Sequence, residues 1–149
     1  MCALLLLLWL GVNVLGANVP ANTDLWKARD DQDRAALARI AAQRSSAAEK
    51  APADAAAQYQ AALAQSTLAE IATELRDKDL ARKASDAGIA AAERAVGLDP
   101  KRSEYHRIHG TLCGQAAAAH GHAEQEGNPS MSPLRHFCLC DCLCAYQVE

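Results

Sequence analysis

The sequence predicts an all-α protein built from antiparallel helix hairpins. Of the 149 residues, 34 are alanine, and phenylalanine occurs once, at Phe137. Alanine, leucine, glutamate, lysine, arginine and glutamine are the strongest helix formers. A β-sandwich or barrel would need many more β-branched and aromatic residues. Only 16 large apolar residues lie between Asn22 and Gly127, so we do not expect a thick core, because each buried methylene contributes only about 0.8 kcal/mol.

The charged residues argue against a nucleic-acid partner. The chain has 15 Lys and Arg against 18 Asp and Glu, a net charge of −3. Both signs are interspersed, and no basic run reaches five residues. A nucleic-acid groove needs a basic stripe, and base stacking needs aromatic side chains. We therefore expect no binding to nucleic acid.

The N-terminal 21 residues resemble a secretory signal peptide. Their apolar stretch covers about 13 residues, from Ala3 to Leu15, whereas a membrane-spanning helix needs about 20. A signal peptide has an apolar region of about 7–15 residues followed by small residues. Cleavage after Ala21, or after Ala17, would leave a secreted or periplasmic chain without a membrane span. No Lys or Arg precedes the apolar stretch, so an uncleaved anchor and a misassigned start codon stay open as alternatives.

Four helices are predicted after the signal peptide. The first covers 24–48, with an exposed polar middle at 29–34. The second covers 53–77 and has Pro52 before its first turn, where proline fits well. The third covers 80–98 with Asp79 as its N-cap, and the fourth begins at Ser103. We expect the last three to pack as consecutive antiparallel neighbours around a shared core of Leu68, Ile71, Leu75, Ile89, Val96, Ile108 and Leu112, which recur at helical spacing.

One charged ladder lies on the second predicted helix. Glu70, Glu74 and Lys78 are spaced i, i+4, i+8. We interpret them as a solvated face with weak ion pairing. A two-helix carboxylate metal site would need a Glu-x-x-His motif beside them, and the sequence has none.

The stretch from Ala91 to Gly114, AAERAVGLDPKRSEYHRIHGTLCG, resembles the junction between two tetratricopeptide repeats. In that family each repeat is two antiparallel helices. Gly88, Ala95, Pro100 and Gly110 reproduce the family's spacing of small residues, proline and glycine. Small residues let helices approach, and proline cannot continue the helix. Ala92 and Cys113 stand where the family usually has aromatic residues.

The resemblance implies a scaffold for protein–protein interaction without enzymatic activity or cofactors. Tetratricopeptide repeats bind a peptide or a partner protein on their concave face. At least three repeats normally cover the end faces, and this chain has at most two. It therefore needs capping by its first helices, a partner, or self-association. A generic antiparallel helix bundle with a proline-containing turn is the alternative to the repeat interpretation.

The predicted helical domain spans 22–115, and we expect 116–149 to be a disordered tail. Pro129 and Pro133 mark turns. No apolar helical stripe continues into the tail. One explanation for this change in pattern is that the tail originates from another exon or from a shifted reading frame.

Four alternating cysteines in the tail, Cys138, Cys140, Cys142 and Cys144, carry the alternative function. In this alternative, the chain is a secreted, thiol-rich protein that binds a metal or forms disulfides through these cysteines. Soft ions such as Cu(I) or Zn bind thiolate-rich sites, with His136 as a possible further ligand, whereas structural zinc sites usually space their cysteines by two to four residues. Disulfides are favoured in an exported chain. His106 and His109 on the fourth helix lack a zinc-protease motif, and we interpret them as surface or interface residues.

Overall fold

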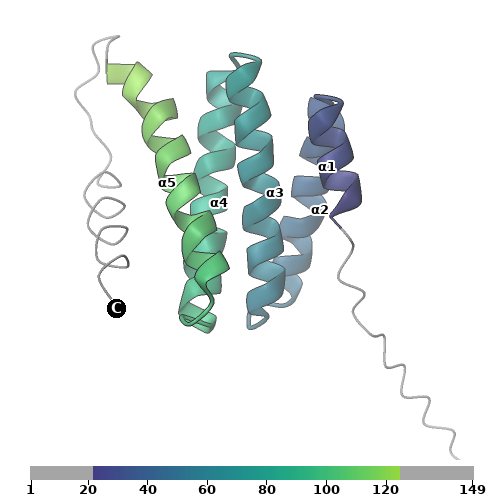
Figure 1. The fold of residues 1–149 in the computed structure, drawn as a ribbon, viewed down its shortest axis with the longest axis vertical. Helices are drawn as coiled ribbons and strands as arrows, with labels where there is room; N and C mark the ends of the chain where they lie inside the picture. Colours follow the sequence, from purple (N-terminus) through teal and green to yellow (C-terminus); the bar gives the residue numbers. More distant parts are fainter. Residues whose placement is uncertain (1–21, 125–149) are drawn as a thin grey trace, which may run out of the picture.

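The computed structural model describes residues 22–124, and five helices account for most of them. They are α1 (Thr23–Asp30), α2 (Arg34–Lys50), α3 (Ala55–Glu74), α4 (Lys78–Leu98) and α5 (Ser103–Glu124). The described residues contain no β-strand, which confirms the predicted all-α class. Helices α1, α3 and α5 form one layer, and α2 and α4 lie behind it (Figure 1).

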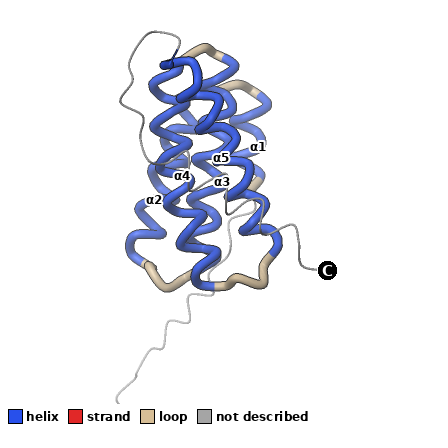
Figure 2. Tube along the Cα trace, turned by 90° about the vertical axis from the view of Figure 1, so that its left-hand side faces the viewer, coloured by secondary structure: helices blue, strands red, loops and turns tan. Residues whose placement is uncertain are grey.

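The helices stand side by side, with their connections at the two ends of the bundle (Figure 2). Each connection is only a few residues long, so consecutive helices run antiparallel. Helix α3 lies in the centre and packs against all four other helices. Helix α5 packs against both α3 and α4, as α3 does against both α1 and α2. The two layers of helices thus pack directly against each other.

The single helix predicted over 24–48 is wrong, because Asp31, Gln32 and Asp33 divide it into α1 and α2. Gln32 has a φ of 51°, which ends α1 in the left-handed region. The carboxylate of Asp33 accepts a hydrogen bond from the Ala36 amide at 2.9 Å. Short acidic side chains favour such caps over helix interiors. The polar residues at 29–34 therefore end one helix and begin the next.

The turn between α3 and α4 repeats the geometry of the turn between α1 and α2. Arg76 has a φ of 59°, matching Gln32. The amides of Asp33 and Asp77 donate to carbonyl oxygens five residues earlier, at 2.9 and 2.8 Å, the pattern of a Schellman motif. Each of these aspartates then caps the next helix by accepting from the amide three residues later, at 2.9 and 3.1 Å. The N-cap of α4 is thus Asp77, and the prediction of Asp79 is wrong.

The two turns at the other end of the bundle also match each other. The amides of Ala51 and Asp99 donate to carbonyl oxygens four residues earlier, at 3.1 and 3.0 Å. A proline follows each of these residues, Pro52 in one turn and Pro100 in the other. Helix α3 starts at Ala55 under an Asp54 cap, so Pro52 lies in the turn rather than beside the first turn of the helix.

Alanine dominates the core. More than half of the buried hydrophobic residues are alanine, and the largest fully buried apolar side chains are Leu25, Leu37, Ile71 and Leu112. Five of the seven predicted core residues are buried: Leu68, Ile71, Ile89, Ile108 and Leu112. Val96 is half-buried, and Leu75 is 48% exposed, so the prediction for Leu75 is wrong. Leu75 lies just beyond the last residue of α3, where the helical stripe no longer faces a neighbour.

The predicted boundary after Gln115 also differs from the structure, because α5 continues to Glu124. Ala116 is 7% exposed and belongs to the core. His120 Nε2 lies 3.1 Å from an Asp86 carboxylate oxygen on α4. The expected signal peptide at 1–21 and the cysteine run lie outside the described residues. Within 22–124, no helix is long and apolar enough to cross a membrane.

Candidate interaction face

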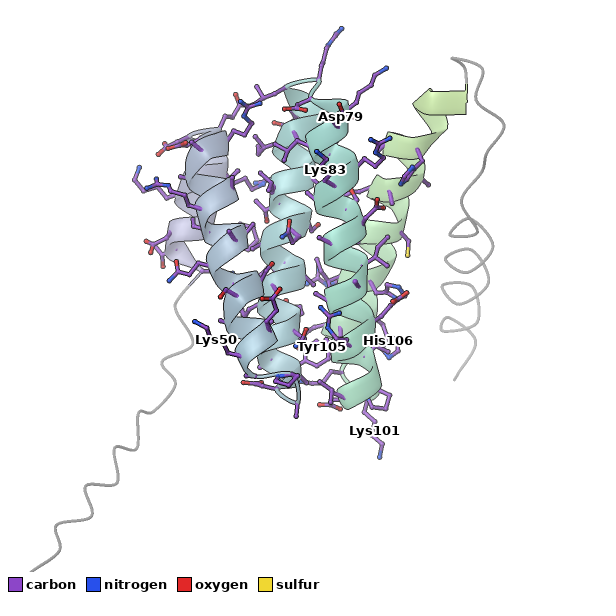
Figure 3. The ribbon with its side chains drawn as sticks, turned by 180° about the vertical axis from the view of Figure 1, so that it is seen from behind. Lys50, Asp79, Lys83, Lys101, Tyr105 and His106 are labelled. Carbon is purple, nitrogen blue, oxygen red and sulfur yellow. The ribbon has the colours of Figure 1, made fainter. Side chains whose placement is uncertain are left out.

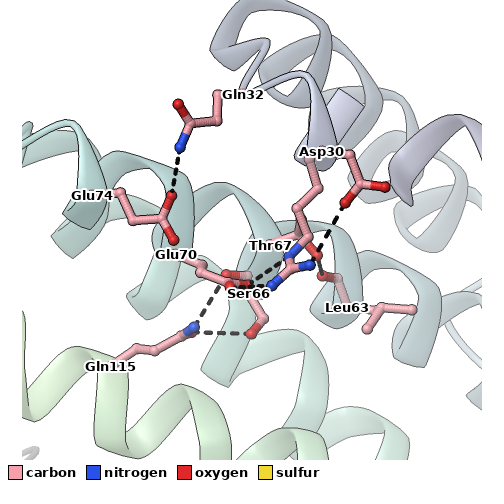
Figure 4. Close-up of polar contacts among 9 residues, drawn as sticks. Asp30, Gln32, Leu63, Ser66, Thr67, Glu70, Glu74 and Gln115 are labelled. Carbon is pink, nitrogen blue, oxygen red and sulfur yellow. Dashed lines mark hydrogen bonds and ion pairs between the residues drawn. The ribbon is translucent and has the colours of Figure 1, made fainter. Parts of the chain in front are cut away.

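The layer of α1, α3 and α5 presents a surface that we call the odd-helix face. On it, polar side chains of α3 reach toward both neighbouring helices of the layer (Figure 4). Glu70 accepts two hydrogen bonds from the Arg29 guanidinium of α1, from Nη2 at 2.6 Å and from Nε at 3.2 Å. One turn further, Gln32 Nε2 donates to Glu74 Oε2 at 3.1 Å. These bonds fasten the short helix α1 to the centre of the bundle.

The predicted ladder of Glu70, Glu74 and Lys78 is therefore corrected. Glu70 pairs with Arg29 of α1 and Glu74 with Gln32 in the turn after α1, whereas Lys78 begins α4 and forms no hydrogen bond or ion pair with either carboxylate. The sequence spacing could not reveal this, because the partners are about 40 residues away in the chain. The only sequence signal for these contacts is the spacing of Glu70 and Glu74, which lie one helical turn apart and can face the same neighbouring segment.

On the other side of α3, the same face joins α5. The hydroxyl of Ser66 donates to Gln115 Oε1 at 3.0 Å, and Gln115 Nε2 donates back to the Ser66 carbonyl at 3.2 Å. Ser66 is 6% exposed, so this reciprocal pair satisfies polar atoms that burial would otherwise leave unpaired. Neither residue belongs to a sequence motif that predicts this contact. Helices α1, α3 and α5 are thus connected by polar contacts across their whole layer.

The charges of the odd-helix face suit recognition better than acid–base chemistry. Hydrogen bonding to Glu70, together with its charge, raises the pKa of Arg29 above its ordinary value. A raised pKa means that the guanidinium stays protonated until the solution is strongly alkaline. Trp26 lies three residues before Arg29, on a neighbouring strip of α1, and is 43% exposed. An exposed tryptophan beside an ion pair offers both apolar and polar contacts to a partner.

A second arginine sits at the junction of α2 and α3. Arg44 Nη1 donates to Gln60 Oε1 at 2.8 Å, and no described carboxylate forms an ion pair with it. Burial lowers the pKa of Arg44 from its ordinary value, and the charge of Asp24 opposes that shift. Arg44 nevertheless remains a cation, because arginine is effectively always protonated in proteins.

The four residues that carry the repeat resemblance lie between α4 and α5 or in the turn that joins them. At Gly88, an added Cβ would lie 2.5 Å from Leu112 Cδ2 and 3.2 Å from Gln65 Cβ, so a larger residue here would force the Leu112 side chain to move. Ala95 is fully buried. Pro100 is exposed in the turn, and Gly110 is half-buried on α5.

The α5 histidines have separate environments. At the start of α5, His106 lies beside Tyr105 and the turn that carries Lys101 (Figure 3), and its Nε2 lies 2.8 Å from the Pro100 carbonyl oxygen. His109 Nε2 is buried, 3.9 Å from Glu93 Oε1. The two histidines thus have different partners.

Metal binding has no support within 22–124, where no three His, Cys, Asp or Glu residues come together to hold an ion. The candidate ligands Cys138, Cys140, Cys142 and Cys144 lie outside the described residues.

Comparison with known proteins adds no family. No family model, no curated protein and no solved structure matches the chain. The class that the fold itself defines is an alanine-rich, all-helical protein in two layers.

Proposed function

We propose that this chain is an exported helical-repeat module that binds a protein or peptide partner on its odd-helix face. The observation that carries the proposal is the duplication of turn geometry. Gln32 and Arg76 occupy equivalent left-handed positions 44 residues apart, and Pro52 and Pro100 occupy equivalent positions 48 residues apart. Two copies of one hairpin unit, α1–α2 and α3–α4, account for both correspondences.

The packing order supports the same proposal. In stacked hairpins, each new unit begins with a helix that covers both helices of the preceding unit. Helix α3 covers α1 and α2 in this way, and α5 covers α3 and α4. On this interpretation α5 is the first helix of a third unit. The close approach of Leu112 to Gly88 lies at the junction between the second and third units.

The units are longer than the tetratricopeptide standard of about 34 residues, so we propose an atypical repeat. The first helices of stacked units line one face, which in tetratricopeptide proteins is the concave, peptide-binding face. Here that face is the odd-helix face, and Trp26 of α1 is exposed three residues before Arg29, which pairs with Glu70. We propose a binding role without catalysis.

Site-specific photo-crosslinking tests the binding role. A benzophenone amino acid at position 26 should trap a partner from extracts or medium of the source cells. The same probe at Arg82 of α4, in the other layer, is the matched control. We expect a discrete adduct from position 26 that mass spectrometry identifies and that unlabelled protein competes away. Equal adducts from both positions, or none from position 26, would contradict the proposal.

Export is tested separately by mass spectrometry of the protein purified from the secreted or periplasmic fraction. The expected N-terminus follows Ala17 or Ala21. A chain that starts at Met1 in the cytoplasmic fraction would contradict export and leave the binding role intact.

A further inference from the structure

Cys113 is a buried residue of α5 that takes part in a disulfide bond. It is 7% exposed, and it is the only cysteine among residues 22–124. Its partner is therefore one of the cysteines outside that range, which are Cys2, Cys138, Cys140, Cys142 and Cys144. The choice among them decides which segment of the chain is joined to α5.

Cys113 lies on the side of α5 that packs against α4. His109 precedes it by four residues and His120 follows it by seven, which are the spacings of one strip along a helix. Both histidines lie close to carboxylates of α4. His109 Nε2 is 3.9 Å from Glu93 Oε1, and His120 Nε2 is 3.1 Å from Asp86 Oδ1. We call this line of contact the α4–α5 seam, and Cys113 is part of it.

The α4–α5 seam borders the layer of helices that contains α2 and α4 (Figure 1). Helix α2 follows α1 in the chain and packs against α3, and α4 follows α3 and packs against α5. Among the described residues, no helix follows α5 in this layer. A segment that comes after Glu124 would take the next position in the layer, beside α4 and against α5.

The four cysteines of the tail are close enough along the chain to reach Cys113, which they follow by 25 to 31 residues. Glu124 is 11 residues beyond Cys113, about 17 Å along the helix. The 14 residues from Glu124 to Cys138 span up to about 45 Å when extended. Cys2 instead precedes α1, which lies at the opposite edge of its layer from α5 (Figure 1). Its disulfide with Cys113 would close a loop of 111 residues, and a longer loop costs more entropy to close.

From these observations we propose that Cys113 pairs with one of the tail cysteines and that this disulfide holds the tail against the α4–α5 seam. The oxidant is a small-molecule disulfide such as oxidised glutathione. Two protein thiols lose two protons and two electrons, a protein S–S bond forms, the S–S bond of the oxidant breaks, and two small-molecule thiols are released. Compartments outside the cytoplasm favour this reaction. The inference does not depend on the partner proposed for the odd-helix face, so either proposal can fail alone.

Peptide mapping of the full chain under non-reducing conditions identifies the partner of Cys113. The protein is oxidised with glutathione, free thiols are alkylated, and the monomer is isolated from a non-reducing gel. Trypsin cuts after Arg107 and Arg135, which places Cys113 in the peptide 108–135 and all four tail cysteines in the peptide 136–149. We expect these two peptides in one species that a reductant splits. A monomer with alkylated Cys113, or with Cys113 joined to the peptide 1–27 that carries Cys2, would overturn the proposal, as would chains found only as disulfide-linked dimers.

Urea denaturation tests whether the disulfide holds the tail against the helices. Cys113→Ser removes one end of the bond, and a matched variant with all four tail cysteines changed to serine removes the other end and keeps Cys113. Oxidised wild-type protein should unfold at a higher urea midpoint than reduced wild-type protein, because the bond restricts the unfolded chain. Both variants should have the same midpoint with and without reductant. Each protein is compared with itself, so a packing change at position 113 cancels. A wild-type midpoint that reductant does not change, or an equal effect of reductant on the variants, would overturn the proposal.

Discussion

Gly88 provides the most direct test of the close packing between α4 and α5. In Gly88→Ala, the added Cβ would lie 2.5 Å from Leu112 Cδ2, 3.1 Å from Leu112 Cδ1 and 3.2 Å from Gln65 Cβ. Leu112 is fully buried, so its side chain cannot move aside without displacing its neighbours. Enlarging a packed site in this way costs about 1–3 kcal/mol. The higher helix propensity of alanine stabilises the folded state by about 1 kcal/mol, which offsets part of this cost.

The matched control is Gly114→Ala, which makes the same change in a helix interior where the new methyl meets nothing within 4 Å. It should raise the free energy of unfolding by up to about 1 kcal/mol. The gain in helix propensity is common to both variants, so the difference between them isolates the cost of crowding. We expect Gly88→Ala to be about 1–3 kcal/mol less stable than Gly114→Ala.

Urea denaturation followed by circular dichroism at 222 nm measures both variants. The midpoints should separate while the m-values stay equal, because the surface exposed on unfolding is nearly unchanged. Adding Leu112→Ala to Gly88→Ala should reduce the crowding cost, and a double-mutant cycle measures that coupling. Equal stabilisation of both glycine variants would show that α5 does not approach α4 at Gly88, and the reasoning would fail.

Three further predictions concern a turn, a surface pair and a buried amide. Arg76→Gly should raise stability by about 0.5–1 kcal/mol in urea denaturation, because glycine adopts the left-handed region at this helix end without the penalty that other residues pay; a loss of stability would contradict the turn geometry. Glu70→Gln should lower the melting temperature at low salt, and the difference should shrink as sodium chloride is added, because salt screens the pair with Arg29; a salt-independent difference would point to another cause. Gln58 of α3 is buried, donates to the Ala48 carbonyl at 2.9 Å and accepts from Arg94 Nε at 2.9 Å; Gln58→Met keeps the side-chain volume but removes both bonds, so we expect a loss of about 1–3 kcal/mol in the same urea assay, and an unchanged midpoint would show that the amide does not stabilise the fold.

Helix content and most of the core could be predicted from the sequence because both depend on local signals. Leu68 and Ile71 lie on the predicted stripe and are buried, whereas Leu75, on the same stripe, lies beyond the end of α3 and is exposed. Periodicity does not reveal the break at Gln32, because a polar stretch such as 29–34 fits the exposed face of one long helix as well as a turn between two helices. A single capping aspartate, Asp33, decides the boundary there. The same effect moved the start of α4 from the predicted Asp79 to Asp77.

The candidate site was less accessible to sequence reasoning. The sequence shows that a tryptophan stands at position 26 and a glutamate at position 70. It does not show that Glu70 pairs with Arg29, because the two residues lie far apart in the chain. The bond between Ser66 and Gln115 joins two helices through ordinary polar residues that carry no motif. Gly88 is the exception, since a glycine inside a helix indicates close approach of a neighbour. The structure supplied that neighbour, Leu112.

The alanine-rich core also has a consequence for side-chain entropy. A buried alanine has no rotamers to lose, whereas burying leucine or methionine costs about 0.5–2 kcal/mol in lost rotamer freedom. More than half of the buried hydrophobic residues are alanine, so the chain folds with little ordering of core side chains. An alanine methyl group is attached directly to the backbone, and its order parameter in NMR relaxation follows the motion of its helix. Isotope labelling of alanine methyls would therefore let each helix of this bundle report its own backbone dynamics from within the core.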